Sequence, residues 1–127
     1  MNEGRGTDLA TRTKRFAVEI IRLYSRLPKS VEAQVLRRQV LRSGTSVGAQ
    51  YREAMRAKSV PDFVSKIEGA LQELEETRYW LELMVELGSL DGAARIATLI
   101  DETDELTAIL VASVRTAKRR KASARGT

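Results

Sequence analysis

The chain contains no cysteine and no histidine, and only two of its 127 residues are proline. Without cysteine, a disulfide, a thiol nucleophile and a thiolate metal site are all excluded. Without histidine, the commonest general base and the commonest metal ligand are missing. The longest apolar run, residues 108–112, is far shorter than the roughly 20 residues that span a bilayer. These absences exclude catalytic and metal sites that depend on cysteine or histidine.

Length and composition indicate one globular domain. A chain of 127 residues is long enough for a single hydrophobic core. Hydrophobic residues make up 43% and charged residues 31%, which are values of a folded chain rather than a disordered one. The N-terminal segment is polar and carries no apolar signal region, so we expect a cytoplasmic protein.

Apolar residues recur at helical spacing in four segments, approximately 8–26, 30–57, 60–87 and 90–118. Ser30 and Ser59 are suited to cap two of these helices, and Gly88 ends the third. Short connections between amphipathic helices predict an all-α, antiparallel, up-down-up-down four-helix bundle. We expect residues 1–7 and the basic tail 119–127 to be disordered.

Two glycines, Gly44 and Gly48, lie on one side of the second predicted helix. Each costs an exposed helix about 1 kcal/mol relative to alanine. Close approach of a neighbouring backbone explains them, and a local kink at residues 43–48 is the alternative. A phosphate-binding loop is a third interpretation, but the P-loop spacing and the preceding strand are missing.

The third predicted helix has a second apolar side. Trp80, Leu83 and Leu87 fall away from its main apolar stripe. A small chain has few elements to cover such a side, so these residues are candidates for an interface between identical subunits. The alternative is that Trp80 packs against the first helix, or the segment before it, within one subunit.

Charge is unevenly distributed along the chain. Residues 1–59 and 118–127 carry an excess of basic side chains, whereas residues 60–117 carry an excess of acidic ones. Such asymmetry is typical of nucleic-acid binding or of complementary packing between subunits.

Three sequence stretches resemble a known family. They are residues 41–54 (LRSGTSVGAQYREA), Asp62-Phe63 with Lys66, and residues 70–81 (ALQELEETRYWL). They are similar to the four-helix-bundle proteins encoded in intervening sequences of bacterial large-subunit ribosomal RNA genes. The resemblance covers roughly residues 14–115. Gln50 departs from it, because that family often has asparagine there.

The resemblance implies a cytoplasmic helical bundle. The more distant relatives of that family include the accessory protein of diversity-generating retroelements, a basic ring of five subunits that binds nucleic acid. The resemblance therefore favours a homopentamer. It does not define a biochemical role, because the role of the family is largely undefined.

Two groups of polar residues are candidate sites. Exposed basic residues are candidates for contact with nucleic-acid phosphates: Lys14, Arg15, Arg52, Arg56, Lys58, Lys118, Arg119, Arg120 and Lys121. Ordinary solubilising charge is the alternative for them. The polar residues of the resemblance form a candidate network, with Arg42 paired to acids of the third helix: Arg42, Gln50, Glu53, Glu73, Glu76 and Tyr79. An all-carboxylate Mg²⁺ site is conceivable there, but the spacing does not require it.

The sequence thus predicts a non-enzymatic, homo-oligomeric bundle that binds RNA or DNA through basic surfaces. An oligomeric scaffold for a protein partner, without a nucleic-acid role, is the alternative. An enzyme is disfavoured because no nucleophile–base pair, phosphate loop or metal motif is present. We expect no cofactor, no bound metal and no membrane partner.

Overall fold

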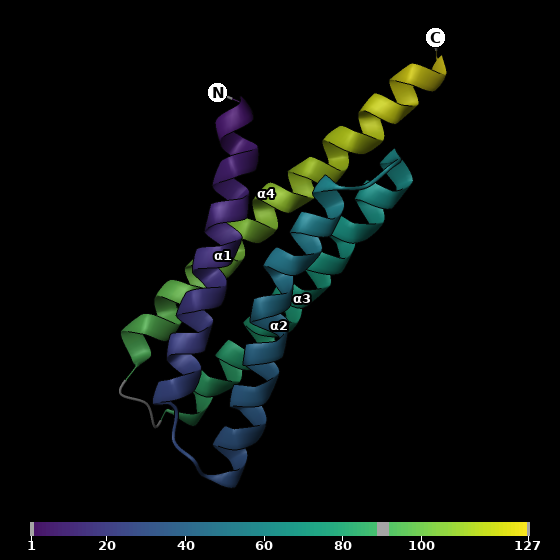
Figure 1. The fold of residues 1–127 in the computed structure, drawn as a ribbon. Coiled ribbons are helices and arrows are strands. Elements are labelled where there is room, and N and C mark those ends of the chain that lie inside the picture. Colours follow the sequence, from purple (N-terminus) through teal and green to yellow (C-terminus); the bar gives the residue numbers. More distant parts are fainter. Residues whose placement is uncertain (1, 89–91, 127) are drawn as a thin grey trace.

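The computed structural model describes residues 2–88 and 92–126 and folds them into four helices. These are α1 (Asn2–Arg26), α2 (Val31–Met55), α3 (Val60–Leu87) and α4 (Ala93–Gly126). Successive helices run in opposite directions (Figure 1). Both α1 and α3 pack against α2 and α4, so α1 and α3 lie diagonally across the bundle. The predicted all-α four-helix bundle is confirmed, and no helix within these residues could cross a membrane.

The predicted helix ends are largely confirmed by their caps. Ser30 Oγ accepts a hydrogen bond from the Ala33 N–H at 3.3 Å, and Ser59 Oγ accepts one from the Asp62 N–H at 3.2 Å. Each serine satisfies an N–H that the first turn of a helix leaves without a partner. Gly88 ends α3 with φ of 65°, a left-handed conformation that glycine adopts without strain.

The core is built mainly from large aliphatic side chains of all four helices, with Phe16, Tyr51 and Met84 buried among them. Those that are almost completely buried are Phe16, Ile20, Leu23, Val40, Val47, Ile67, Leu74, Leu81, Ile96, Leu106 and Leu110. Burying one such side chain contributes about 1.5–3 kcal/mol, so this core is the main source of stability. Thr13 and Thr103 are also buried, and their hydroxyls donate to the carbonyl oxygens of Leu9 and Leu99.

Helix α2 runs without a break through residues 43–48, and its two glycines lie against α1. A Cβ on Gly44 would lie 2.7 Å from Ile20 Cγ1, and one on Gly48 would lie 3.2 Å from Thr13 Oγ1. Close packing of the two helices is therefore confirmed as the reason for the glycines. The alternatives of a kink and of a phosphate-binding loop are wrong.

The chain ends differ from the prediction of disorder. Helix α1 begins at Asn2 and α4 continues to Gly126, so the prediction is wrong for residues 2–7 and 119–126. Extending an existing helix avoids the cost of nucleation, and alanine, lysine and arginine in the tail favour helix. Residues 1 and 127 lie outside the described residues. So do residues 89–91, which include the predicted start of the fourth helix near residue 90.

Candidate nucleic-acid interface and interhelical contacts

Ion pairs join α3 to α2 and to α4, and α1 to α4. The pairs between helices are Arg12–Glu102, Arg12–Glu105, Arg95–Glu19, Arg42–Glu73, Arg42–Glu76, Lys66–Glu53, Arg78–Asp104 and Lys118–Glu68. Such partly exposed pairs contribute about 0–1 kcal/mol each. Their larger effect is that each of these basic side chains already has a carboxylate partner in the same chain.

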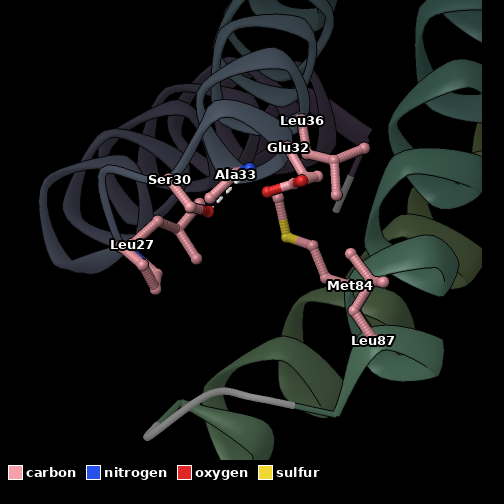
Figure 2. Close-up of a pocket in the computed structure, with 8 residues that line it drawn as sticks. Leu27, Ser30, Glu32, Ala33, Leu36, Met84 and Leu87 are labelled. Atoms are coloured by element: carbon pink, nitrogen blue, oxygen red, sulfur yellow. Dashed lines mark hydrogen bonds between the residues drawn. The ribbon is translucent and has the colours of Figure 1, made fainter.

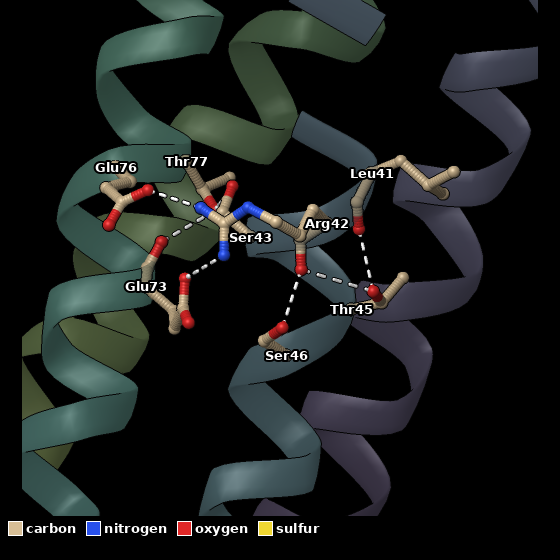
Figure 3. A network of polar contacts seen from close by, with 8 residues as sticks. All are labelled: Leu41, Arg42, Ser43, Thr45, Ser46, Glu73, Glu76 and Thr77. Carbon is tan, nitrogen blue, oxygen red and sulfur yellow. Dashed lines mark hydrogen bonds and ion pairs between the residues drawn. The ribbon is translucent and has the colours of Figure 1, made fainter. Parts of the chain in front are cut away.

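Arg42 forms the pairing that the sequence predicts (Figure 3). Its Nη1 lies 3.2 Å from Glu73 Oε1 and its Nη2 lies 2.5 Å from Glu76 Oε1. The guanidinium therefore reaches from α2 across to two successive turns of α3. The Arg42 side chain remains 51% exposed, so this contact contributes little to the stability of the fold.

A hydroxyl pair lies beneath this arginine and was not predicted from the sequence (Figure 3). Ser43 and Thr77 are fully buried, and their hydroxyl oxygens lie 2.8 Å apart. Thr77 Oγ1 is also 2.8 Å from the carbonyl oxygen of Glu73. Because each hydroxyl has one hydrogen, the two side chains satisfy each other and this carbonyl together. The pair fixes α2 against α3 inside the core.

The rest of the predicted polar network separates into distinct contacts. Glu53 pairs with Lys66 at 3.2 Å. The Gln50 side chain lies against Gly69, where an added Cβ would be 2.9 Å from Gln50 Oε1. Tyr79 meets the ring of Trp80 edge-on, with ring centroids 5.1 Å apart. Within residues 2–88 and 92–126, the acidic side chains form no cluster that could hold a metal ion.

The shifted pKa values follow from these contacts. Hydrogen bonding by Arg78 lowers the pKa of Asp104, and the same contact raises the pKa of Arg78. A hydrogen bond to Glu102 is the largest cause of the raised pKa of Arg12. Burial raises the pKa of Tyr51. Interhelical pairing and burial therefore account for the shifts.

Seven of the predicted nucleic-acid residues lie towards the same end of the bundle, in two groups on either side of α3. Three belong to the end of α2 and its connection to α3, and four belong to the C-terminal part of α4. The Glu53–Lys66 pair joins α2 to α3 there, and the Lys118–Glu68 pair, at 3.8 Å, joins α4 to α3 two residues further along. We call this set the terminal basic surface: Arg52, Arg56, Lys58, Lys118, Arg119, Arg120 and Lys121. All are exposed except Lys121, which is half-buried. Lys118 alone among them has an ion pair with a described residue.

The other two predicted basic residues lie elsewhere. Lys14 and Arg15 are exposed on the outer side of α1. Their neighbour Thr13 packs at the level of Gly48, about two helical turns from Arg56. The structure therefore separates them from the end of the bundle.

The predicted interface residues differ in exposure. Trp80 and Leu83 are half-buried and pack against the core of their own chain, whereas Leu87 is 58% exposed. Trp80 Nε1 is buried and has no hydrogen-bond partner in the described part of the chain. Two exposed valines near the start of α2 were not predicted as surface residues, Val31 at 76% and Val35 at 56%. They lie off the buried stripe of α2, which is the signal that could have identified them.

An open cavity of about 490 Å³ lies at the opposite end of the bundle, between the α1–α2 connection and the end of α3 (Figure 2). Its lining is mostly apolar and consists of Leu27, Pro28, Ser30, Glu32, Ala33, Leu36, Met84 and Leu87. Glu32 supplies a charged group to this lining. The sequence does not reveal the cavity, because it depends on how the connection packs against α3.

Comparison with known proteins gives a consistent result. Residues 6–112 match the sequence model of the 23S rRNA-intervening sequence protein family. A similar solved structure is a protein with unknown function from the S23 ribosomal protein family of Bacteroides thetaiotaomicron, with 34% sequence identity and a TM-score of 0.79. The match covers 87% of this chain and 97% of the other. No functionally curated protein matches the chain.

Proposed function

Because this chain belongs to the 23S rRNA-intervening sequence protein family, we propose that it is a non-enzymatic, homo-oligomeric bundle that binds RNA or DNA. The terminal basic surface is the observation that carries this proposal. A pentamer is the expected assembly, in keeping with the distant relatives that the sequence resembles. The cytoplasm is the expected compartment.

The distribution of ion pairs supports a phosphate-binding role for the terminal basic surface. Many basic side chains between helices are occupied by carboxylates, as Arg42 and Arg78 are. At the end of the bundle, six of the seven side chains have no such pair within the described residues. Exposed arginines and lysines without such pairs, on both sides of α3 at one end of the bundle, form the electrostatic footprint expected of a nucleic-acid surface.

Binding to this surface should be strongly dependent on salt. Each phosphate contact to a single strand contributes about −0.7 to the slope of log K against log salt concentration. Seven contacts per chain would give a slope of about −5. Affinity should therefore fall steeply between low and physiological salt.

The test is fluorescence anisotropy with a labelled single-stranded RNA and a duplex DNA across a range of salt concentrations. The triple variant Arg52→Ala, Arg56→Ala, Lys58→Ala should weaken binding and reduce the slope by about 2. A matched control removes three exposed basic side chains outside the terminal basic surface: Arg26→Ala, Lys29→Ala and Arg38→Ala. Equal losses in the two variants, or no binding to either probe at low salt, would contradict the proposal.

Exposed apolar side chains support the proposal of a homo-oligomer. Tyr79, Val85 and Leu87 of α3 are each more than half exposed. Aromatic residues such as Tyr79 are typical anchors at protein interfaces, and neighbouring exposed apolar side chains mark interaction sites. Light scattering on the purified protein tests this point, with a mass near five chains expected and a mass of one chain against it.

A protein scaffold without a nucleic-acid role is the second candidate. The outer side of α3 carries exposed acidic residues next to Tyr79 and Val85, which suits a basic partner. An oligomer whose mass is unaffected by nucleic acid would favour this candidate. A pull-down that recovers only this chain would count against it.

A further inference from the structure

The outer side of α1 is basic with an apolar centre. Val18 and Ile21 are 37% and 49% exposed and lie one turn apart. Lys14 and Arg15 are exposed on the same side one turn before them, and Arg22 follows. We call these five residues the α1 face. Within it, Arg22 alone has an ion pair with a described residue, to Glu19.

The outer side of α3 has the opposite charge and also an apolar centre. Tyr79 is 53% exposed, and Leu83, one turn later, is half-buried. Glu75, Glu82 and Glu86 are exposed around them. We call these five residues the α3 face. Glu82 has an ion pair with Arg78, and Glu75 and Glu86 have none with a described residue.

These two faces lie on diagonally opposite helices, which point in the same direction (Figure 1). Interhelical contacts fix their relative height. Ile20 of α1 packs on Gly44 of α2, and the adjacent Ser43 bonds to Thr77 of α3. Ile20 and Thr77 therefore lie at the same level of the bundle.

Ile21 and Tyr79 lie one and two residues beyond that level on parallel helices. At 1.5 Å per residue, their heights differ by only about 1.5 Å. A sideways displacement of one copy brings its Ile21 beside the Tyr79 of the next without a shift along the axis, and the angle between the two faces sets the rotation that accompanies it. The same displacement brings Lys14 to within about one turn of Glu75.

We infer that the α1 face of one copy docks on the α3 face of a second copy of this chain. Both faces have an apolar centre, they carry opposite charge, and they lie at the same height in the bundle. Charge complementarity of this kind selects partners and register. Because the contact joins two different faces, it is head-to-tail, and repetition closes into a ring when the rotation allows it. This inference rests on the proposed homo-oligomer and assigns Lys14 and Arg15 to the subunit contact.

Charge reversal on each face tests the inference. One variant carries Lys14→Glu and Arg15→Glu, and the other carries Glu75→Lys and Glu86→Lys. None of the four residues has an ion pair with a described residue, so far-UV circular dichroism should stay unchanged. Sedimentation velocity without nucleic acid should show each variant shifted towards the mass of one chain. Position 75 and positions 14 and 15 then carry charges of the same sign across the contact, while position 86, about 10 Å along the axis from Arg22, adds repulsion at longer range.

The quadruple variant with both faces reversed should regain the mass of the wild-type assembly. In a head-to-tail contact this variant again places opposite charges together, whereas a contact between two identical faces would not be restored. The variant Asp101→Lys is the control, because it reverses an exposed charge of α4 outside both faces.

Each outcome is decisive. A wild-type protein that sediments as one chain overturns the homo-oligomer proposal and this inference together. A wild-type oligomer that neither face variant disturbs overturns this inference alone. A quadruple variant that stays helical but dissociated overturns the head-to-tail pairing of these faces.

Discussion

Replacing Gly44 by alanine should destabilise the protein, although alanine is the better helix former. The new Cβ would lie 2.7 Å from Cγ1, 3.0 Å from Cγ2 and 3.1 Å from Cδ1 of Ile20. Ile20 is completely buried and, as a β-branched residue in a helix, has essentially one rotamer. Overpacking of this kind costs about 1–3 kcal/mol. The gain in helix propensity is about 1 kcal/mol, so the net loss should be about 0–2 kcal/mol.

Gly69→Ala is the matched comparison, since it changes the same residue type in the interior of a helix. There the Cβ would lie 2.9 Å from Gln50 Oε1, the far end of a flexible, half-buried side chain that can move aside. We expect this variant to gain up to about 1 kcal/mol. Both variants gain the same helix propensity. The difference between their free energies of unfolding therefore reports the contact of the new Cβ with Ile20.

The assay is urea unfolding followed by far-UV circular dichroism at a fixed protein concentration, because assembly would add to the apparent stability. The two free energies of unfolding should differ by about 1–3 kcal/mol. In an Ile20→Ala background, which removes all three contacting atoms, Gly44→Ala should instead stabilise by about 1 kcal/mol. Equal effects of Gly44→Ala and Gly69→Ala in the wild-type background would refute the argument that α1 and α2 require this glycine.

Two further predictions concern the polar contacts. Thr77→Val should lower the free energy of unfolding by about 1–3 kcal/mol, because it leaves the buried Ser43 hydroxyl without this partner. In urea unfolding, the double variant Ser43→Ala, Thr77→Val should lose less stability than the sum of the two single variants. Additive losses would contradict the pairing. Because the pKa of Asp104 is lowered in the folded protein, the ionised carboxylate stabilises the fold. This stabilisation is fully present above the unfolded-state pKa and is lost as the pH falls through the folded-state pKa. Asp104→Asn should therefore flatten the fall in Tm below about pH 4, and an unchanged profile would contradict the role of the Arg78 contact.

The helices and their ends could be predicted because their causes are local. Apolar spacing marks the sides that face the core, and capping residues such as Ser30 and Ser59 act within one turn. The extra turns at both chain ends were missed for a related reason. Residues 119–126 have no apolar stripe to indicate helix, yet they extend a helix that the bundle has already nucleated.

Contacts between helices could be predicted only in part. Arg42 was predicted to pair with Glu73 and Glu76, because a charge among small and apolar residues needs a partner. The buried pair of Ser43 and Thr77 gave no such signal. Two short hydroxyl side chains separated by 34 residues meet only through the register of α2 and α3, which the sequence pattern does not specify.

The two proposals place nucleic-acid binding and self-association on different parts of the bundle, and their geometry links them. The proposed contact uses the flanks of α1 and α3, whereas the terminal basic surface lies at one end. A rotation axis parallel to the bundle keeps that end on the same side in every copy. A ring would therefore carry all of its terminal basic surfaces on one rim. When one RNA strand contacts several of these surfaces at once, the effective concentration of each contact rises. The face variants that dissociate the ring should therefore weaken binding to a long RNA more than binding to a short one.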